Sequence, residues 1–192
     1  NNVAVGKNSL ALNTTGSNNV AVGRQSLDAN TTGQKNTAVG QGALGANTTA
    51  NDNTALGVNA LLANTTGERN TAIGSCALKV ATTANDNTAV GKSSLTANTS
   101  GTGNVSIGNA MEANTEGNDN TALGNGSLQT NTTGDNNTAL GRLALKLNTT
   151  ANNNTAVGYT SLCANTTGTS NTALGVEALF KNTTASNNTA VG

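Results

Sequence analysis

A 17-residue repeat runs through the whole chain and constrains its fold more than any other feature. Each of the twelve copies begins with Asn, from Asn2 in the first copy to Asn188 in the last. The twelfth copy is incomplete and contains only five residues. The copy from Asn104 to Asp119 is one residue short. A fixed short period is the signature of stacked-repeat proteins, so we number each copy from its leading Asn as positions 1 to 17.

Apolar residues recur within each copy with the period of a β-strand. Position 4 is always Val, Leu or Ile, position 2 is Thr or Val, and position 3 is Ala in every copy but one. We expect positions 2 and 4 to point inward on a short strand, with position 3 facing out. Positions 9, 11 and 13 show the same alternation and predict a second strand.

Two short strands joined by Gly-containing corners predict an all-β fold, a parallel β-solenoid (β-roll or β-helix) with one 17-residue repeat per coil. Residues 1–192 then form a single repeat array of eleven complete coils and a partial twelfth. Because the array begins at a repeat boundary and stops inside a repeat, we expect a segment of a longer chain. Tracts rich in Gly, Asn and Thr also occur in disordered proteins, but such proteins have no need to keep apolar residues at fixed positions.

The predicted core takes one large apolar residue from position 4 and one from position 9 of every coil. These residues are Val5, Leu10, Val22, Leu27, Val39, Leu44, Leu56, Leu61, Ile73, Leu78, Val90, Leu95, Ile107, Met111, Leu123, Leu128, Leu140, Leu145, Val157, Leu162, Leu174 and Leu179.

The Asn at position 1 is predicted to form a structural ladder. A primary amide carries both donors and an acceptor, so identical Asn side chains one coil apart can bond along the rod. The ladder residues are Asn2, Asn19, Asn36, Asn53, Asn70, Asn87, Asn104, Asn120, Asn137, Asn154, Asn171 and Asn188.

A second Asn, at position 12, begins an Asn-Thr-Thr or Asn-Thr-Ser sequon in nine coils. If position 12 faces outward, these residues are candidate glycosylation sites along one edge of the rod. The alternative is that this Asn turns or ladders the backbone, and Thr glycosylation is a further option. The candidates are Asn13, Asn30, Asn47, Asn64, Asn98, Asn131, Asn148, Asn165 and Asn182.

The residue inventory points away from catalysis, cofactors and metal. The chain has no His, and no acidic pair recurs at a fixed place. Cys76 and Cys163 lie five coils apart, too far for a disulfide within a straight rod. Asp residues at position 17 could touch a cation, but they lack the dense carboxylates of calcium-binding repeats, so a solvated face is preferred. Zero net charge gives no reason to expect nucleic acid, and no apolar run is long enough to span a membrane.

The segments Asn2–Gly6, Asn19–Gly23 and Asn104–Gly108 resemble the head repeats of YadA-like trimeric autotransporter adhesins. The Asn-Thr-Ala-Val-Gly copies look like the same motif with Thr in place of Val. The resemblance covers five of every 17 residues. It implies a left-handed parallel β-roll in which three chains associate, displayed on a bacterial surface to bind host or matrix.

These observations predict a non-enzymatic protein, an extracellular or cell-surface structural fibre, scaffold or adhesin. We expect self-association as a homo-oligomer or a head-to-tail fibre, and a glycan or surface receptor as a further partner. The alternative function is ice binding, which needs outward Thr residues in adjacent ranks on a flat face. With positions 2 and 13 predicted inward, only the Thr column at position 14 is expected to face out.

Overall fold

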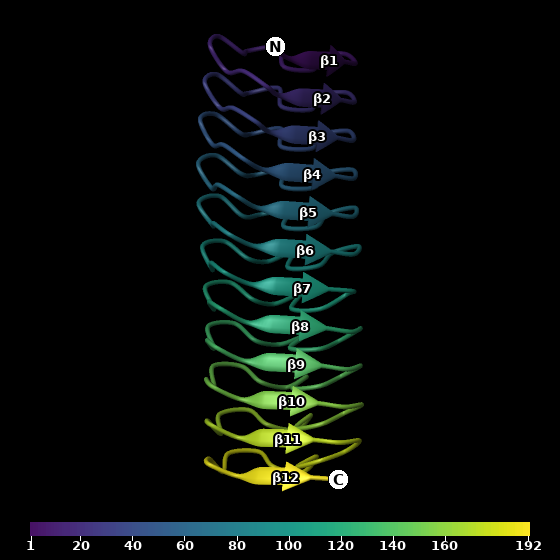
Figure 1. The fold of residues 1–192 in the computed structure, drawn as a ribbon, viewed down its shortest axis with the longest axis vertical. Coiled ribbons are helices and arrows are strands. Elements are labelled where there is room, and N and C mark those ends of the chain that lie inside the picture. The colour runs from purple at the N-terminus through teal and green to yellow at the C-terminus, as the bar shows by residue number, and fades with distance from the viewer.

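The computed structural model describes all residues 1–192 as a straight stack of coils, with one strand per coil and the two termini at opposite ends (Figure 1). The structure contains twelve parallel strands and no helix, which confirms the predicted all-β solenoid. The strands follow chain order in a single sheet that runs the length of the rod. They are β1 (Val3–Val5), β2 (Val20–Val22), β3 (Thr37–Val39), β4 (Thr54–Leu56), β5 (Thr71–Ile73), β6 (Thr88–Val90), β7 (Val105–Ile107), β8 (Thr121–Leu123), β9 (Thr138–Leu140), β10 (Thr155–Val157), β11 (Thr172–Leu174) and β12 (Thr189–Val191).

Each strand pairs in register with the equivalent strand of the next coil. Thr54 lies opposite Thr71, and Ala55 lies opposite Ala72. The short copy keeps this register, because Val105 of β7 pairs with Thr121 of β8. The missing residue is therefore absorbed outside the sheet.

The Gly at position 5 follows every strand with a positive φ, a conformation that favours Gly. Gly57 has a φ of +137°, which side-chain-bearing residues rarely adopt. A Cβ on Gly57 would lie 2.6 Å from the carbonyl carbon of Gly74 in the next coil. The stacking of equivalent Gly residues thus sets the corner that follows each strand.

The strand faces are reversed relative to the sequence prediction. Position 3 is buried in every coil from Ala21 to Ala173, whereas Leu56 and Leu123 at position 4 are each 46% exposed. The prediction that position 4 forms core is therefore wrong for all eleven residues proposed. They are half-buried or exposed: Val5, Val22, Val39, Leu56, Ile73, Val90, Ile107, Leu123, Leu140, Val157 and Leu174.

The narrow interior behind the strand explains this reversal. Position 8, which is Ala or Ser, packs directly against position 3 of the neighbouring coil. The Ser94 hydroxyl donates to the carbonyl oxygen of Ser106 at 2.9 Å, and the two hydroxyls lie 2.7 Å apart. Only small side chains fit such a gap, so the larger Val, Leu and Ile residues take the outer face.

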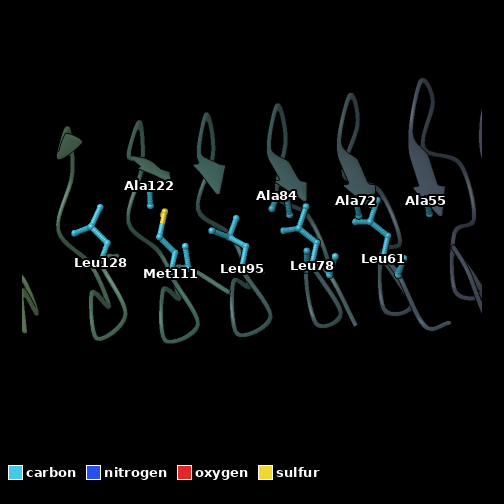
Figure 2. Close-up of a cluster of buried hydrophobic side chains, with 14 of the residues drawn as sticks. Ala55, Leu61, Ala72, Leu78, Ala84, Leu95, Met111, Ala122 and Leu128 are labelled. Carbon is cyan, nitrogen blue, oxygen red and sulfur yellow. The ribbon is translucent and has the colours of Figure 1, made fainter. Parts of the chain in front are cut away.

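The column at position 9 fills the rest of the interior. Leu27 to Leu162 at this position, with Met111 in the short coil, are fully buried. Figure 2 shows one such side chain per coil, lying between the strand and the opposite loop. Leu10 and Leu179 of the two terminal coils are partly buried and pack against the same cluster. Position 9 is thus core, as predicted.

The predicted second strand is wrong. In the fourth coil, the buried residues Leu61, Asn64 and Gly67 are followed by Asn70 of the next coil, a spacing of three rather than two. Turns and bends form this part of the coil, and Leu61 itself has a φ of +49°. Position 11 is consequently half-buried or exposed in every complete coil, which accommodates the charged Lys181 there.

Substitutions of two Leu residues in one coil test which of them is buried in the core and which faces outward. Leu128→Ala should destabilise the chain by about 2–5 kcal/mol, because it opens a cavity in the closed interior. Leu123→Ala should cost well under half as much, since this side chain is already 46% exposed. Urea unfolding at concentrations where the chain is monomeric measures both. Equal losses in the free energy of unfolding would support the sequence prediction that position 4 lies in the core.

Candidate functional site

The functional potential of this chain lies in its repeated columns rather than in one cluster of reactive groups. No three His, Cys, Asp or Glu side chains gather closely enough to hold a metal ion. The chain contains no helix that could serve as a membrane span. The features with recurring geometry are two Asn columns, a Thr column and the outer face of the sheet.

The Asn column at position 1 forms the predicted ladder, although its main bond between coils comes from the backbone. The backbone N–H of Asn36 donates to Oδ1 of Asn19 at 2.9 Å. Nδ2 of Asn36 donates to the carbonyl of Ala50, at position 15 of its own coil, at 2.8 Å. From Asn19 to Asn171 every member is buried. Each side chain therefore joins two coils and closes its own coil.

A second Asn ladder runs along position 12. Nδ2 of Asn47 donates to Oδ1 of Asn30 at 2.8 Å and to the carbonyl of Ala50 at 3.2 Å. The carbonyl at position 15 thus accepts hydrogen bonds from both Asn columns of its coil. The chain thus carries two polar ladders, of which the one at position 12 is interrupted at Ala81.

The outward position 12 that glycosylation requires is contradicted by the structure. Seven of the nine candidates are fully buried, with Nδ2 already donating in the ladder. These are Asn30, Asn47, Asn64, Asn98, Asn131, Asn148 and Asn165. Asn13 and Asn182 of the terminal coils are half-buried and donate to the same position-15 carbonyls. The amide nitrogens that would carry a glycan instead hold the coils together.

The Thr column at position 13 has a role that the sequence analysis missed. The hydroxyl of Thr65 donates to the carbonyl of Thr82, the equivalent residue one coil along, at 3.0 Å. Thr132 and Thr149 are related in the same way at 3.1 Å. These residues are half-buried or exposed rather than inward. The signal was the presence of Thr in every complete copy, because Val would fit the same space but cannot donate.

The outer face of the sheet is an uncharged strip made of positions 2 and 4. Thr or Val at position 2 is half-exposed in all inner coils, beside the Val, Leu and Ile column of position 4. None of the nine basic and nine acidic side chains lies on a strand. A continuous exposed apolar column of this length is unusual for a surface that faces only water.

The charged side chains occupy other faces, and one group is paired. Nε of Arg69 lies 2.7 Å from Oδ1 of Asp86 in the next coil, and Arg69 also contacts Glu68. Hydrogen bonding by Arg69 holds the pKa of the Asp86 carboxyl below its usual value. Asp52 and Asp119 share position 17 with Asp86 and are exposed, as expected for a solvated face.

The two cysteines are free thiols, in agreement with their predicted separation. Burial raises the pKa of the Cys163 thiol above its usual value. Both residues lie at positions that vary between coils. Neither belongs to a recurring column.

A shallow recess of about 360 Å³ interrupts the rod between the second and fourth coils. Gly42 and Gly45 form its floor at positions where most other coils carry side chains. Gln25, Asp28, Asn59 and Leu62 stand around it. The recess thus combines amide and carboxylate groups with the apolar side chains of Ala46, Leu62 and Ala63.

Two substitutions in one sequon test whether the Asn at position 12 serves as a ladder residue or as a glycan acceptor. Asn131→Ala removes the bonds to Asn114 and Gly134 and should cost about 1–3 kcal/mol, because buried partners lose their hydrogen bonds. Thr133→Ala destroys the same sequon but changes only an exposed side chain, so the free energy of unfolding should stay within about 0.5 kcal/mol. Chemical unfolding measures both. Similar losses from the two variants would contradict the ladder assignment.

Comparison with known proteins adds no relative, since no family model, no curated protein and no solved structure matches the chain.

Proposed function

We propose that this protein is a non-enzymatic structural rod, an extracellular fibre or surface scaffold whose copies associate through the outer face of the sheet. The observation that carries the proposal is the uncharged column of Val, Leu and Ile along that face. The uniform coils supply a stiff body, because each coil is bonded to its neighbours along the whole of its length.

The composition of the sheet face is that of an interface core. Interface cores are depleted in charge, and every charged side chain of this chain lies elsewhere. Twelve strands at about 4.8 Å spacing, each about 10 Å long, give a strip of roughly 500 Å². Two such strips would bury about 1,000 Å² in total, which reaches the lower range of specific interfaces. A second copy of the chain supplies a strip with the same length and spacing.

At a cell surface, such a rod would also serve in adhesion. The resemblance to YadA-like head repeats supports both surface display and association of several chains. Positions 6, 7, 10, 16 and 17 carry most of the variation between coils and offer different groups to a receptor. The recess around Gly42 and Gly45 is the hollow best suited to a glycan, because amide and carboxylate groups can bond its hydroxyls.

A charge placed on the sheet face tests self-association. The wild-type chain should sediment as a homo-oligomer, and Leu123→Glu should shift it toward monomer by putting a carboxylate into an apolar contact. Leu147→Glu is the matched control, since Leu147 is 42% exposed at position 11, outside the sheet. Analytical ultracentrifugation reads the mass of each. A wild-type chain that is monomeric at every concentration, or an unchanged mass for Leu123→Glu, would refute the proposal.

Ice binding is a second candidate, because the structure places the Thr column of position 2 on the outer face. Nine of the twelve residues at this position are Thr, spaced by one coil along a single sheet. The Val, Leu and Ile residues beside them differ in length, which makes the strip less regular than an ice lattice. If this function holds, the wild-type chain should show thermal hysteresis, and Thr71→Lys should abolish it while Thr66→Lys at position 14 should not. Wild-type chain without hysteresis would exclude it.

A further inference from the structure

The Asn ladder at position 12 is broken at a single coil. Position 12 is Asn in every complete copy except the fifth, where it is Ala81. In an unbroken coil, Nδ2 of this Asn makes two hydrogen bonds. For Asn64 they run to Oδ1 of Asn47 at 2.9 Å and to the carbonyl of Gly67 at 3.0 Å. Ala81 has no amide and can supply neither bond.

The break removes a hydrogen-bond partner from three buried polar groups. Oδ1 of Asn64 is the buried side-chain atom of the molecule that has no hydrogen-bond partner. The carbonyl of Ala84, at position 15, accepts from Nδ2 of Asn70 at 2.7 Å but not from a position-12 amide. Nδ2 of Asn98 donates to Gly101 at 2.9 Å, and its usual acceptor one coil back is missing. Asn64, Ala81 and Asn98 are all fully buried.

We infer that this coil binds one internal water molecule in place of the missing amide. The two bonds lost with the amide both required a donor, and water can donate to Oδ1 of Asn64 and to the carbonyl of Ala84 together. These two donated bonds lie within the range of about two to four that a buried water makes. An apolar methyl in place of a carboxamide frees about the volume that one water needs.

The surrounding groups select water over other small ligands. An anion is excluded because Asn64 and Ala84 both present acceptor oxygens. A metal ion would need more oxygen ligands than these two. Leaving the oxygen of Asn64 unpaired would cost about 1–3 kcal/mol in a rod that otherwise satisfies its buried side chains. This inference concerns the ladder and stands independently of the proposed function.

A crystal structure at about 1.8 Å resolution or better tests the site directly. A water within hydrogen-bonding distance of both Oδ1 of Asn64 and the Ala84 carbonyl is the expected result. In Ala81→Asn, the new amide should displace that water and make the ladder continuous. A wild-type map in which Asn64 turns to a protein partner, with no water beside it, would overturn the inference.

The melting temperature gives a second reading that does not depend on crystals. Ala81→Asn should raise it by roughly 2–4 °C, because a direct amide releases the immobilised water and gives the ladder its missing member. Ala97→Asn is the matched control, because it adds the same side chain at half-buried position 11 of the next coil, outside the ladder. A rise in the control equal to that in Ala81→Asn, or a fall in Ala81→Asn, would count against the site.

Discussion

Hydrogen bonding between successive coils is the interaction on which the rest of this structure depends. Of 127 backbone hydrogen bonds, only 22 lie within the strands, and the other 105 lie in turns and loops, most of them joining adjacent coils. Asn and Thr side chains extend the same pattern at positions 1, 12 and 13. A coil taken alone would lose most of these bonds, so the stack, rather than the single coil, is the stable unit.

The thinness of each coil follows from this stacking and determines the outer surface. Small residues at positions 3 and 8 bring the strand and the opposite wall close together, and one Leu per coil fills the remaining space. The larger apolar residues of the strand must then face outward. The narrow interior therefore limits the size of the core and also creates the uncharged strip through which we propose that copies of the rod associate.

The sequence predicts the architecture well and the faces poorly. The period, the Asn ladder and the Leu column could be read directly, because each is a residue type fixed at one position. The alternation along the strand shows that the Val, Leu or Ile at position 4 shares a face with position 2, but it does not show which face is buried. Large apolar side chains are normally assigned to the core, and that assignment fails here because the interior is too narrow for them. The turns after Leu61 were missed because its left-handed backbone is normally a feature of Gly. At position 12, the prediction of an outward glycosylation site is wrong, whereas the alternative prediction of an Asn ladder describes the structure.

Amide hydrogen exchange of the inner coils tests most directly whether bonding between coils extends beyond the sheet. The amide of Thr54 lies in β4, whereas those of Leu61 and Thr65 lie in turns and donate to Ala77 and Thr82 of the next coil at 3.0 Å. If stacking holds each whole coil, Leu61 and Thr65 should be protected to nearly the same degree as Thr54. Free exchange at Leu61 and Thr65 alongside a protected Thr54 would contradict the account.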